Sequence, residues 1–167
     1  QLILNYIKFK TGEDYDKLYS KIFNDKIKIK NSILYGFTSL KEQFGNGHPN
    51  IMATRFDYLR IAKAMMDDYQ NDTCVGKYLK EIHKRRIPKT RKHSSSNTSK
   101  SYGGQFHMDY SGLKNKVVFG MSGYGAQTIL IDMENSRIVV LNSIHYNNKK
   151  YKYSVKKLLI DPIKKGK

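Results

Sequence analysis

Two apolar runs separated by a short polar segment constrain the fold of this chain more than any other feature. Residues 128–132 read TILID and residues 137–143 read RIVVLNS, with a turn at residues 132–136, DMENS. Short runs of β-branched and apolar residues bounded by turn residues are typical of buried strands. The connection is short enough for two antiparallel neighbours. The sequence therefore predicts an antiparallel hairpin over residues 127–143.

A third apolar run precedes this hairpin and ends in small residues. Residues 117–119 read VVF, and the following segment, GMSGYGA at residues 120–126, supplies few large side chains. Glycine within a strand pattern marks either a bulge or a place where another group approaches the backbone closely. We expect a strand around residues 117–120 that pairs with the hairpin. Both interpretations of its glycines, a bulge under a loop and a ligand-contacting backbone, stay open at this point.

The charge balance is strongly basic. The chain has 31 Lys and Arg residues against 14 Asp and Glu, a formal net charge of +17. Such a balance usually indicates nucleic acid or an anionic surface as the partner. Here the lysines are spread along the whole chain together with many Asn, Ile and Tyr residues, a pattern typical of an AT-rich genome. We therefore do not take the charge as a functional signal.

Length and the remaining composition set further limits. The 167 residues suit one domain or most of one. Cys74 is the single cysteine, which excludes an internal disulfide framework. No run is long and apolar enough to predict a transmembrane segment. The chain opens at Gln1 inside an apolar segment, so we expect it to be a fragment whose N-terminus lies upstream.

The first fifty residues predict two helices and a loop. Residues 2–10 are interpreted as the end of a buried helix that Gly12 stops, and residues 13–23 as a second helix whose apolar side chains pack in the core. Residues 24–50 are broken up by glycines and are expected to be mostly loop. His48 has no Cys or carboxylate at ligand spacing, so we predict no metal site there.

Two helices are expected next. Thr54 with Asp57 forms a capping-box pattern at the start of the clearest helix. Its predicted buried stripe is Tyr58, Leu59, Ala62, Met65, Met66 and Tyr69. Arg55 and Arg60 are interpreted as surface or structural ion-pair residues. The shorter helix after Asp72-Thr73 is expected to bury Val75, Leu79 and Ile82.

The segment 84–101 is basic and then Ser-rich, without periodicity, and predicts an exposed, poorly ordered loop. Its basic cluster could contact nucleic acid or lipid headgroups, but it offers no aromatic side chain to stack on bases. Residues 102–108 predict a strand that returns to the sheet. Residues 153–160 predict a closing helix that buries Val155, Leu158 and Leu159 and ends at Asp161-Pro162.

Three segments carry a resemblance to a known family. They are residues 2–15 (LILNYIKFKTGEDY), residues 52–61 (MATRFDYLRI), and residues 123–127 (GYGAQ) followed by Ile131-Asp132 and Ile138-Val139-Val140. Their order resembles the C-terminal half of the β-lactamase and penicillin-binding-protein superfamily of serine hydrolases. The branch that it resembles holds class C β-lactamases, esterases and 6-aminohexanoate-oligomer hydrolases. The resemblance covers nearly the whole chain.

The resemblance implies an α+β, β-lactamase/transpeptidase-like fold, in which an antiparallel sheet packs against helices. Residues 1–167 would be the C-terminal portion of a single domain, with residues 84–101 an exposed loop within it. The implied activity is hydrolysis of an ester or amide bond through an acyl-serine intermediate, without a cofactor. The Ser-x-x-Lys pair and the assisting Tyr are expected upstream of Gln1, so no catalytic residue is assigned in this chain. The family is mostly exported, which suggests a periplasmic or exported setting.

The site that the resemblance places in this chain is the segment Met121, Ser122, Gly123 and Tyr124. The backbone N–H of Tyr124 would be the second donor to the oxyanion. The family usually has Lys/His-Thr/Ser-Gly where this chain has Met121-Ser122-Gly123, so no cation stands there. That difference favours a small ester, amide or peptide-like substrate over a β-lactam carboxylate. An ungapped comparison with class C enzymes places the motif at residues 117–119 instead.

Three lookalikes of the missing motifs are set aside. Ser111 with Lys114 and Ser154 with Lys157 both fit Ser-x-x-Lys, and residues 146–148 (YNN) mimic Tyr-x-Asn. None stands where the family places its motif. Two alternatives stay open: a non-catalytic relative that binds peptides or cell-wall fragments, and a basic nucleic-acid-binding module.

Overall fold

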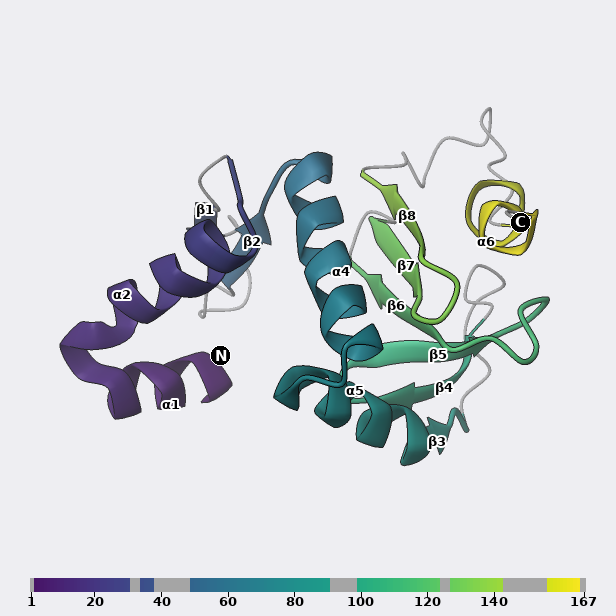
Figure 1. Ribbon diagram of the computed structural model, residues 1–167, viewed down its shortest axis with the longest axis horizontal. Coiled ribbons are helices and arrows are strands. Elements are labelled where there is room, and N and C mark those ends of the chain that lie inside the picture. The colour runs from purple at the N-terminus through teal and green to yellow at the C-terminus, as the bar shows by residue number, and fades with distance from the viewer. Residues whose placement is uncertain are drawn as a thin grey trace. The chain divides into compact units, whose positions relative to one another are not determined.

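The computed structural model describes residues 2–30, 34–37, 49–90, 99–123, 127–142 and 156–165. It divides into two compact units, Gln1–Arg60 and Ile61–Lys167, which we describe separately. Figure 1 marks the helices and strands along the chain. None of the helices in these described ranges is long and apolar enough to cross a membrane.

The first unit is a run of helices followed by a hairpin. It contains α1 (Leu2–Thr11), the 3-10 turn η1 (Gly12–Asp14), α2 (Tyr15–Ser20), the π-helical turn η2 (Lys21–Lys26), and the antiparallel pair β1 (Leu34–Phe37) and β2 (Pro49–Met52). Gly12 has φ +54°, a conformation that glycine adopts without strain, and the helix breaks there as predicted. The predicted burial of this helix is wrong where its side chains are described, because Tyr6 is 62% and Phe9 82% exposed. His48 lies outside the described residues.

The predicted core packing of the second helix is wrong. No residue of α2 or η2 is buried, and Leu18 and Ile22 are exposed. The aromatic side chains instead pack along the helix itself, with the rings of Tyr19 and Phe23 4.5 Å apart. Their helical spacing therefore reflects contacts between successive turns and not burial in a core.

Helix α4 (Arg55–Gln70) begins as the capping-box pattern predicts. The backbone N–H of Asp57 donates to Thr54 Oγ1 (3.2 Å), and that hydroxyl donates to Asp57 Oδ2 (2.8 Å). Asp57 is fully buried and accepts hydrogen bonds from Arg60 Nη1 (2.8 Å) and from the backbone N–H of Lys30 (3.1 Å). This ion pair confirms a structural role for Arg60.

The inward faces of α4 and α5 (Cys74–Lys84) differ from the predicted stripes: two predicted residues are exposed, and Tyr58, Met65 and Ile82 are only half-buried. Ala62, Met66 and Tyr69 are buried as expected, but Leu59 is 40% exposed. Thr73 caps α5 by accepting from the Gly76 N–H at 3.2 Å, and Leu79 is buried, but Val75 is 45% exposed. Gly76 faces inward instead: a Cβ there would lie 1.9 Å from the Asp68 carbonyl oxygen. The helix therefore packs so closely that only glycine fits at its contact point.

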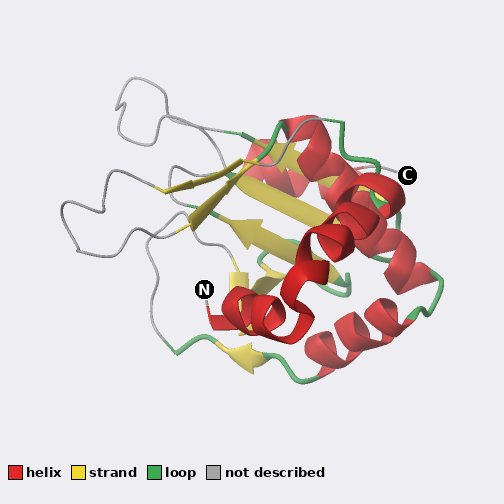
Figure 2. Ribbon diagram, turned by 90° about the vertical axis from the view of Figure 1, so that its left-hand side faces the viewer, coloured by secondary structure: helices red, strands yellow, loops and turns green. Residues whose placement is uncertain are grey.

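The second unit is built on a six-stranded antiparallel sheet in sequential order. Its strands are β3 (Ile87–Pro88), β4 (Ser99–Gly103), β5 (Phe106–Tyr110), β6 (Val118–Ser122), β7 (Thr128–Asp132) and β8 (Arg137–Leu141). Figure 2 shows the strands in yellow and the helices in red. Phe119 pairs with Ile131, and Ile131 pairs with Ile138. The predicted hairpin and the strand that precedes it are both confirmed, and with them the α+β class.

The turn between β7 and β8 is fixed by a buried carboxylate. Asp132 is fully buried, and its Oδ1 accepts from the backbone N–H (3.2 Å) and the side-chain Nδ2 (2.8 Å) of Asn135. Lys116 Nζ donates to Asp132 Oδ2 at 3.0 Å. An Asp that bonds the backbone a few residues on stabilises a tight turn. The polar turn residues are therefore part of the hairpin's structure.

The prediction of one exposed loop over residues 84–101 is wrong in secondary structure at both of its ends, although Lys84, Arg85, Ile87 and Pro88 are exposed as predicted. Lys84 ends helix α5, β3 pairs with β4, and the Lys89 N–H donates to the Lys100 carbonyl at 2.9 Å. Ser99 and Ser101 are buried. Serine side chains can be buried when hydrogen bonds satisfy them, which composition alone does not reveal. Residues 91–98 lie outside the described residues.

The prediction of one strand over residues 102–108 is also wrong, because this segment is a hairpin. Gly104 and Gln105 form its turn, with φ of +53° and +68°. Two central residues at positive φ are typical of the two-residue hairpin turn that matches strand twist. Gly104, the first of these two residues, is thus the turn signal between β4 and β5.

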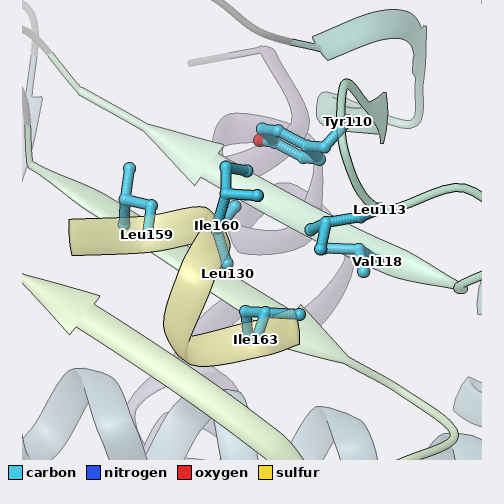
Figure 3. Close-up of a cluster of buried hydrophobic side chains, with 7 residues drawn as sticks. All are labelled: Tyr110, Leu113, Val118, Leu130, Leu159, Ile160 and Ile163. Atoms are coloured by element: carbon cyan, nitrogen blue, oxygen red, sulfur yellow. The ribbon is translucent and has the colours of Figure 1, made fainter. Parts of the chain in front are cut away.

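The sheet has two differently packed faces. On one face, the Phe119 ring lies 6.4 Å from Tyr69, 5.9 Å from His83 and 5.2 Å from Phe106. On the other face, a cluster joins the sheet to the C-terminal helix (Figure 3); its members are Tyr110, Leu113, Val118, Leu130, Leu159, Ile160 and Ile163. Aromatic rings therefore fill one layer, and mainly aliphatic side chains fill the other.

The C-terminal helix extends further than predicted. A π-helical turn, η3 (Lys156–Ile160), leads into α6 (Asp161–Lys165), so Asp161-Pro162 does not end the helix. Pro162 stands in the first turn of α6, where the missing N–H leaves no helical bond unmade. Leu159 is buried as expected, but Leu158 is 37% exposed, and Ile160 and Ile163 are buried. Val155 lies outside the described residues.

One residue of β5 changes the face on which the following side chain lies. Asp109 has φ +52°, in the left-handed region. Met108 pairs with Ser101, and the Ser101 hydroxyl donates to Asp109 Oδ2. Tyr110 instead lies with Val118 in the cluster on the other face of the sheet. Regular alternation would place Met108 and Tyr110 on the same face. The left-handed backbone of Asp109 therefore places the Tyr110 side chain on the opposite face of the sheet from Met108.

The hydroxyl of Tyr110 then lies directly against Gly120 of β6. A Cβ on Gly120 would be 1.8 Å from that oxygen and 2.7 Å from the ring carbon that bears it. Burial raises the pKa of Tyr110. Gly120 is therefore required by the packing of a neighbouring tyrosine.

We expect Gly120→Ala to destabilise the protein by about 1–3 kcal/mol, because the added methyl group overpacks this contact. Urea unfolding monitored by circular dichroism measures the change. The double variant Tyr110→Phe/Gly120→Ala should recover part of the loss, since it removes the nearest clashing atom. Gly123→Ala is the control, because its Cβ would meet only the flexible Gln127 Oε1 at 3.1 Å. An unchanged stability of Gly120→Ala would contradict the contact.

Candidate functional site

The predicted oxyanion segment lies at the end of β6. Met121 is half-buried, and Ser122 and Gly123 are exposed. Ser122 pairs with Thr128 at the start of β7, and the Gly123 N–H donates to the Gln127 carbonyl at 2.9 Å. Tyr124 lies outside the described residues, so its role stays a prediction. The strand end therefore presents small, exposed residues between two interior strands of the sheet.

The hydrogen bonds of this strand end limit which backbone donors a ligand could use. The Gly123 N–H is already committed to Gln127, whose side-chain oxygen also lies close to the Gly123 Cα. A backbone donor serves an oxyanion only when it points at the developing charge. The Gly123 amide does not meet that requirement here, which leaves the predicted Tyr124 amide as the donor to test.

A second polar cluster lies on the three preceding strands of the sheet, from β3 to β5, and was not found from the sequence. Lys89 Nζ is hydrogen-bonded to Ser99 Oγ and lies 2.8 Å from His107 Nδ1, and Ser99 Oγ is 3.5 Å from that same nitrogen. Burial lowers the pKa of Lys89. The cluster depends on the β3–β4 pairing, which joins residues on the two sides of the Ser-rich segment. Predicting it from the sequence would require predicting that pairing.

An ion-pair network holds the opposite side of β5. Arg86 Nε donates to Asp109 Oδ2 (2.6 Å), and the Ser101 hydroxyl donates to the same oxygen (2.5 Å). Burial alone would raise the pKa of Asp109, but the bonds from Arg86 and Ser101 outweigh it and lower that pKa. Burial, reinforced by the nearby Arg86, lowers the pKa of His83. This network stabilises the left-handed residue and is structural.

The sequence lookalikes do not form a site in the described residues. Ser111 and Lys114 are both exposed in the turn between β5 and β6, next to Gly112 with φ +90°. Ser154 and residues 146–148 lie outside the described part of the chain. Within the described ranges, no group of three or more His, Cys, Asp or Glu side chains could hold a metal ion.

The comparisons add no family to this geometry. The chain matches no family model, no curated protein and no solved structure. What is established is therefore an α+β protein with a six-stranded antiparallel sheet, helices packed on it, and polar groups at two places along that sheet.

We expect Asp109→Asn to lower the free energy of unfolding by about 1 kcal/mol at pH 7, since the partly exposed ion pair with Arg86 is screened by solvent. Asn keeps the tolerance for positive φ, so the comparison isolates the charge. A lowered carboxylate pKa stabilises the fold above its ordinary value of 3.8, and this contribution is lost as pH falls through the folded pKa. The difference between the two proteins should therefore shrink below about pH 4.

Asp72→Asn is the matched control. Asp72 also has a positive φ, +52°, and pairs with Lys80, but its side chain is 62% exposed, against 37% for Asp109. Its substitution should change stability less at every pH. A gap between wild type and Asp109→Asn that persists unchanged at low pH would show that the charge is not responsible.

Proposed function

We propose that this chain is the C-terminal portion of a β-lactamase-related serine hydrolase domain that cleaves an ester or amide bond through an acyl-serine intermediate. The observation that carries the proposal is the end of β6, where the exposed Ser122 and Gly123 follow a strand held between β5 and β7. A strand with pairs on both sides is a rigid support for a backbone donor. The nucleophile would come from a Ser-x-x-Lys pair upstream of Gln1.

The chemistry of this strand end suits a neutral substrate. Ser122 and Gly123 leave room for a carbonyl group to approach the backbone, and the amide of Tyr124 would stabilise the charge that develops on its oxygen. No cation stands among Met121, Ser122 and Gly123. The proposal therefore favours a small ester, amide or peptide-like substrate, and a periplasmic or exported setting, over recognition of a β-lactam carboxylate.

The arrangement of the neighbouring elements supports the same proposal. The hairpin β7–β8 follows the site directly. The turn η3 packs on the sheet through Leu159 and Ile160, and α6 does so through Ile163. Helix α4 starts at the capped Thr54, in the segment that resembles the family's helix start. These features are compatible with the α+β fold that the resemblance implies, and the finer family assignment belongs to the proposal.

We expect a longer protein that includes the upstream Ser-x-x-Lys to hydrolyse p-nitrophenyl butyrate with turnover, whereas the 167-residue chain by itself does not turn it over. In the longer protein, Gly123→Pro should lower kcat by about 10²–10³, because it removes the bond to Gln127 and displaces the next amide. Steady-state absorbance at several substrate concentrations measures kcat and KM.

Ser122→Ala is the matched control and should keep its activity, because it leaves the backbone in place. Binding of the ester without turnover in the longer protein would instead favour the non-catalytic alternative. Full activity of Gly123→Pro would overturn the proposed oxyanion strand. Turnover by the chain alone that is lost on Ser111→Ala would place the nucleophile in the turn after β5.

A further inference from the structure

We propose that Ser99 is a second nucleophile, primed by Lys89 and His107, that accepts an acyl group from a small activated ester. This inference does not depend on the proposed function, because all three residues belong to the chain itself and none of them is part of the segment from Met121 to Tyr124, although His107 pairs with Gly120 of β6. It concerns one covalent transfer per chain and not turnover.

The three side chains come together from three consecutive strands. Lys89 directly follows β3, Ser99 opens β4, and His107 lies in β5. The Lys89 N–H bond to the Lys100 carbonyl (2.9 Å) fixes the backbone beside Ser99. Lys89 Nζ is the centre of the cluster, in contact with Ser99 Oγ and 2.8 Å from His107 Nδ1. Regular sheet structure therefore holds all three groups in place.

The contacts give each group a role. A serine hydroxyl is a weak nucleophile until a neighbouring base takes its proton, and a neutral lysine amine can act as that base. Burial lowers the pKa of Lys89, which increases the neutral fraction near neutral pH. His107 Nδ1 can accept a hydrogen bond from the amine when its proton is on the other ring nitrogen. In the structure Lys89 Nζ donates to Ser99 Oγ; with a neutral amine the same contact can be made with the Ser99 hydroxyl as the donor. The amine would then donate to His107 Nδ1, so that its lone pair is directed toward Ser99, and His107 is a positioning residue.

The surroundings restrict the acyl donor to a small one. Ser99 is only 7% exposed, whereas Lys89 and His107 are half-buried. Tyr110 is the cross-strand partner of Ser99, and the Tyr102 ring packs edge-on against His107 at 5.2 Å. Because so little of Ser99 is exposed, the proposal is limited to a donor with a short acyl chain.

The step balances without any further reactant. Ser99 Oγ attacks the carbonyl carbon of the ester while its proton passes to Lys89 Nζ. The carbon–oxygen bond to the leaving group then breaks, and the leaving alkoxide or phenolate takes the proton from Lys89. The products are an acyl ester on Ser99 and a free alcohol or phenol, and Lys89 is neutral again.

The test is a stoichiometric reaction of the folded 167-residue chain with p-nitrophenyl acetate. We expect a burst of about one nitrophenolate per chain and an acetyl group that peptide mass spectrometry maps to Ser99. Hydroxylamine should release it, because it is an ester and not a lysine amide. The burst rate should fall by about 10²-fold in Ser99→Ala and in Lys89→Met.

Lys89→Arg separates base catalysis from charge, because arginine keeps the cation but cannot act as a base. It should react as slowly as Lys89→Met. His107→Asn keeps an acceptor near Nδ1 and should keep most of the burst rate, whereas His107→Phe should lose it. Ser111→Ala is the control for an exposed serine and should react like wild type, and circular dichroism confirms that each variant is folded.

An acetyl group on Lys89, an adduct on another serine, or full reactivity of Lys89→Arg would each overturn the inference. So would the absence of a burst in the folded wild-type chain. The burst is measured on a chain without the upstream nucleophile, and the proposed function is measured as turnover by the longer protein. Either can therefore fail without affecting the other.

Discussion

The left-handed conformation of Asp109 is the constraint on which the second unit depends most. Arg86 and Ser101 hold its carboxylate on the side of the sheet that faces α5, and the next residue, Tyr110, crosses to the other side. Tyr110 then meets Gly120 and completes the layer beneath the C-terminal helix. Tyr110 is also the strand partner of Ser99. The positive φ of Asp109 therefore affects both the packing against Gly120 in β6 and the position of Ser99 in the polar cluster.

The parts of the fold that the sequence predicts correctly are those specified by neighbouring residues. The hairpin of β7 and β8 follows from two β-branched runs around a turn, and the start of α4 follows from Thr54 and Asp57. The segment at Ser122 and Gly123 is placed correctly at a strand end, whereas its proposed donor, Tyr124, is a matter for experiment. The cluster of Lys89, Ser99 and His107 depends on the pairing of three strands, which composition does not reveal.

The incorrect burial predictions share a physical cause. Helical spacing identifies the apolar side of a helix, but close packing decides which residue makes the contact. In α5 the contact falls on Gly76, since the Asp68 carbonyl leaves no room for a side chain, and Val75 is exposed as a result. At the C-terminus, Pro162 lies in the first turn of α6 and does not end the helical segment. The buried residues there are Ile160 and Ile163, whereas Leu158 is exposed.

The position of Pro88 has a consequence for how the protein behaves in concentrated solution. The Lys89 N–H points toward β4, so the nitrogen one residue earlier, that of Pro88, points away from the sheet. Proline at that position removes no bond to β4, and it removes the donor that an outer strand would offer to another molecule. Strand β3 is also only two residues long. This side of the sheet is thus a poor template for cross-β growth.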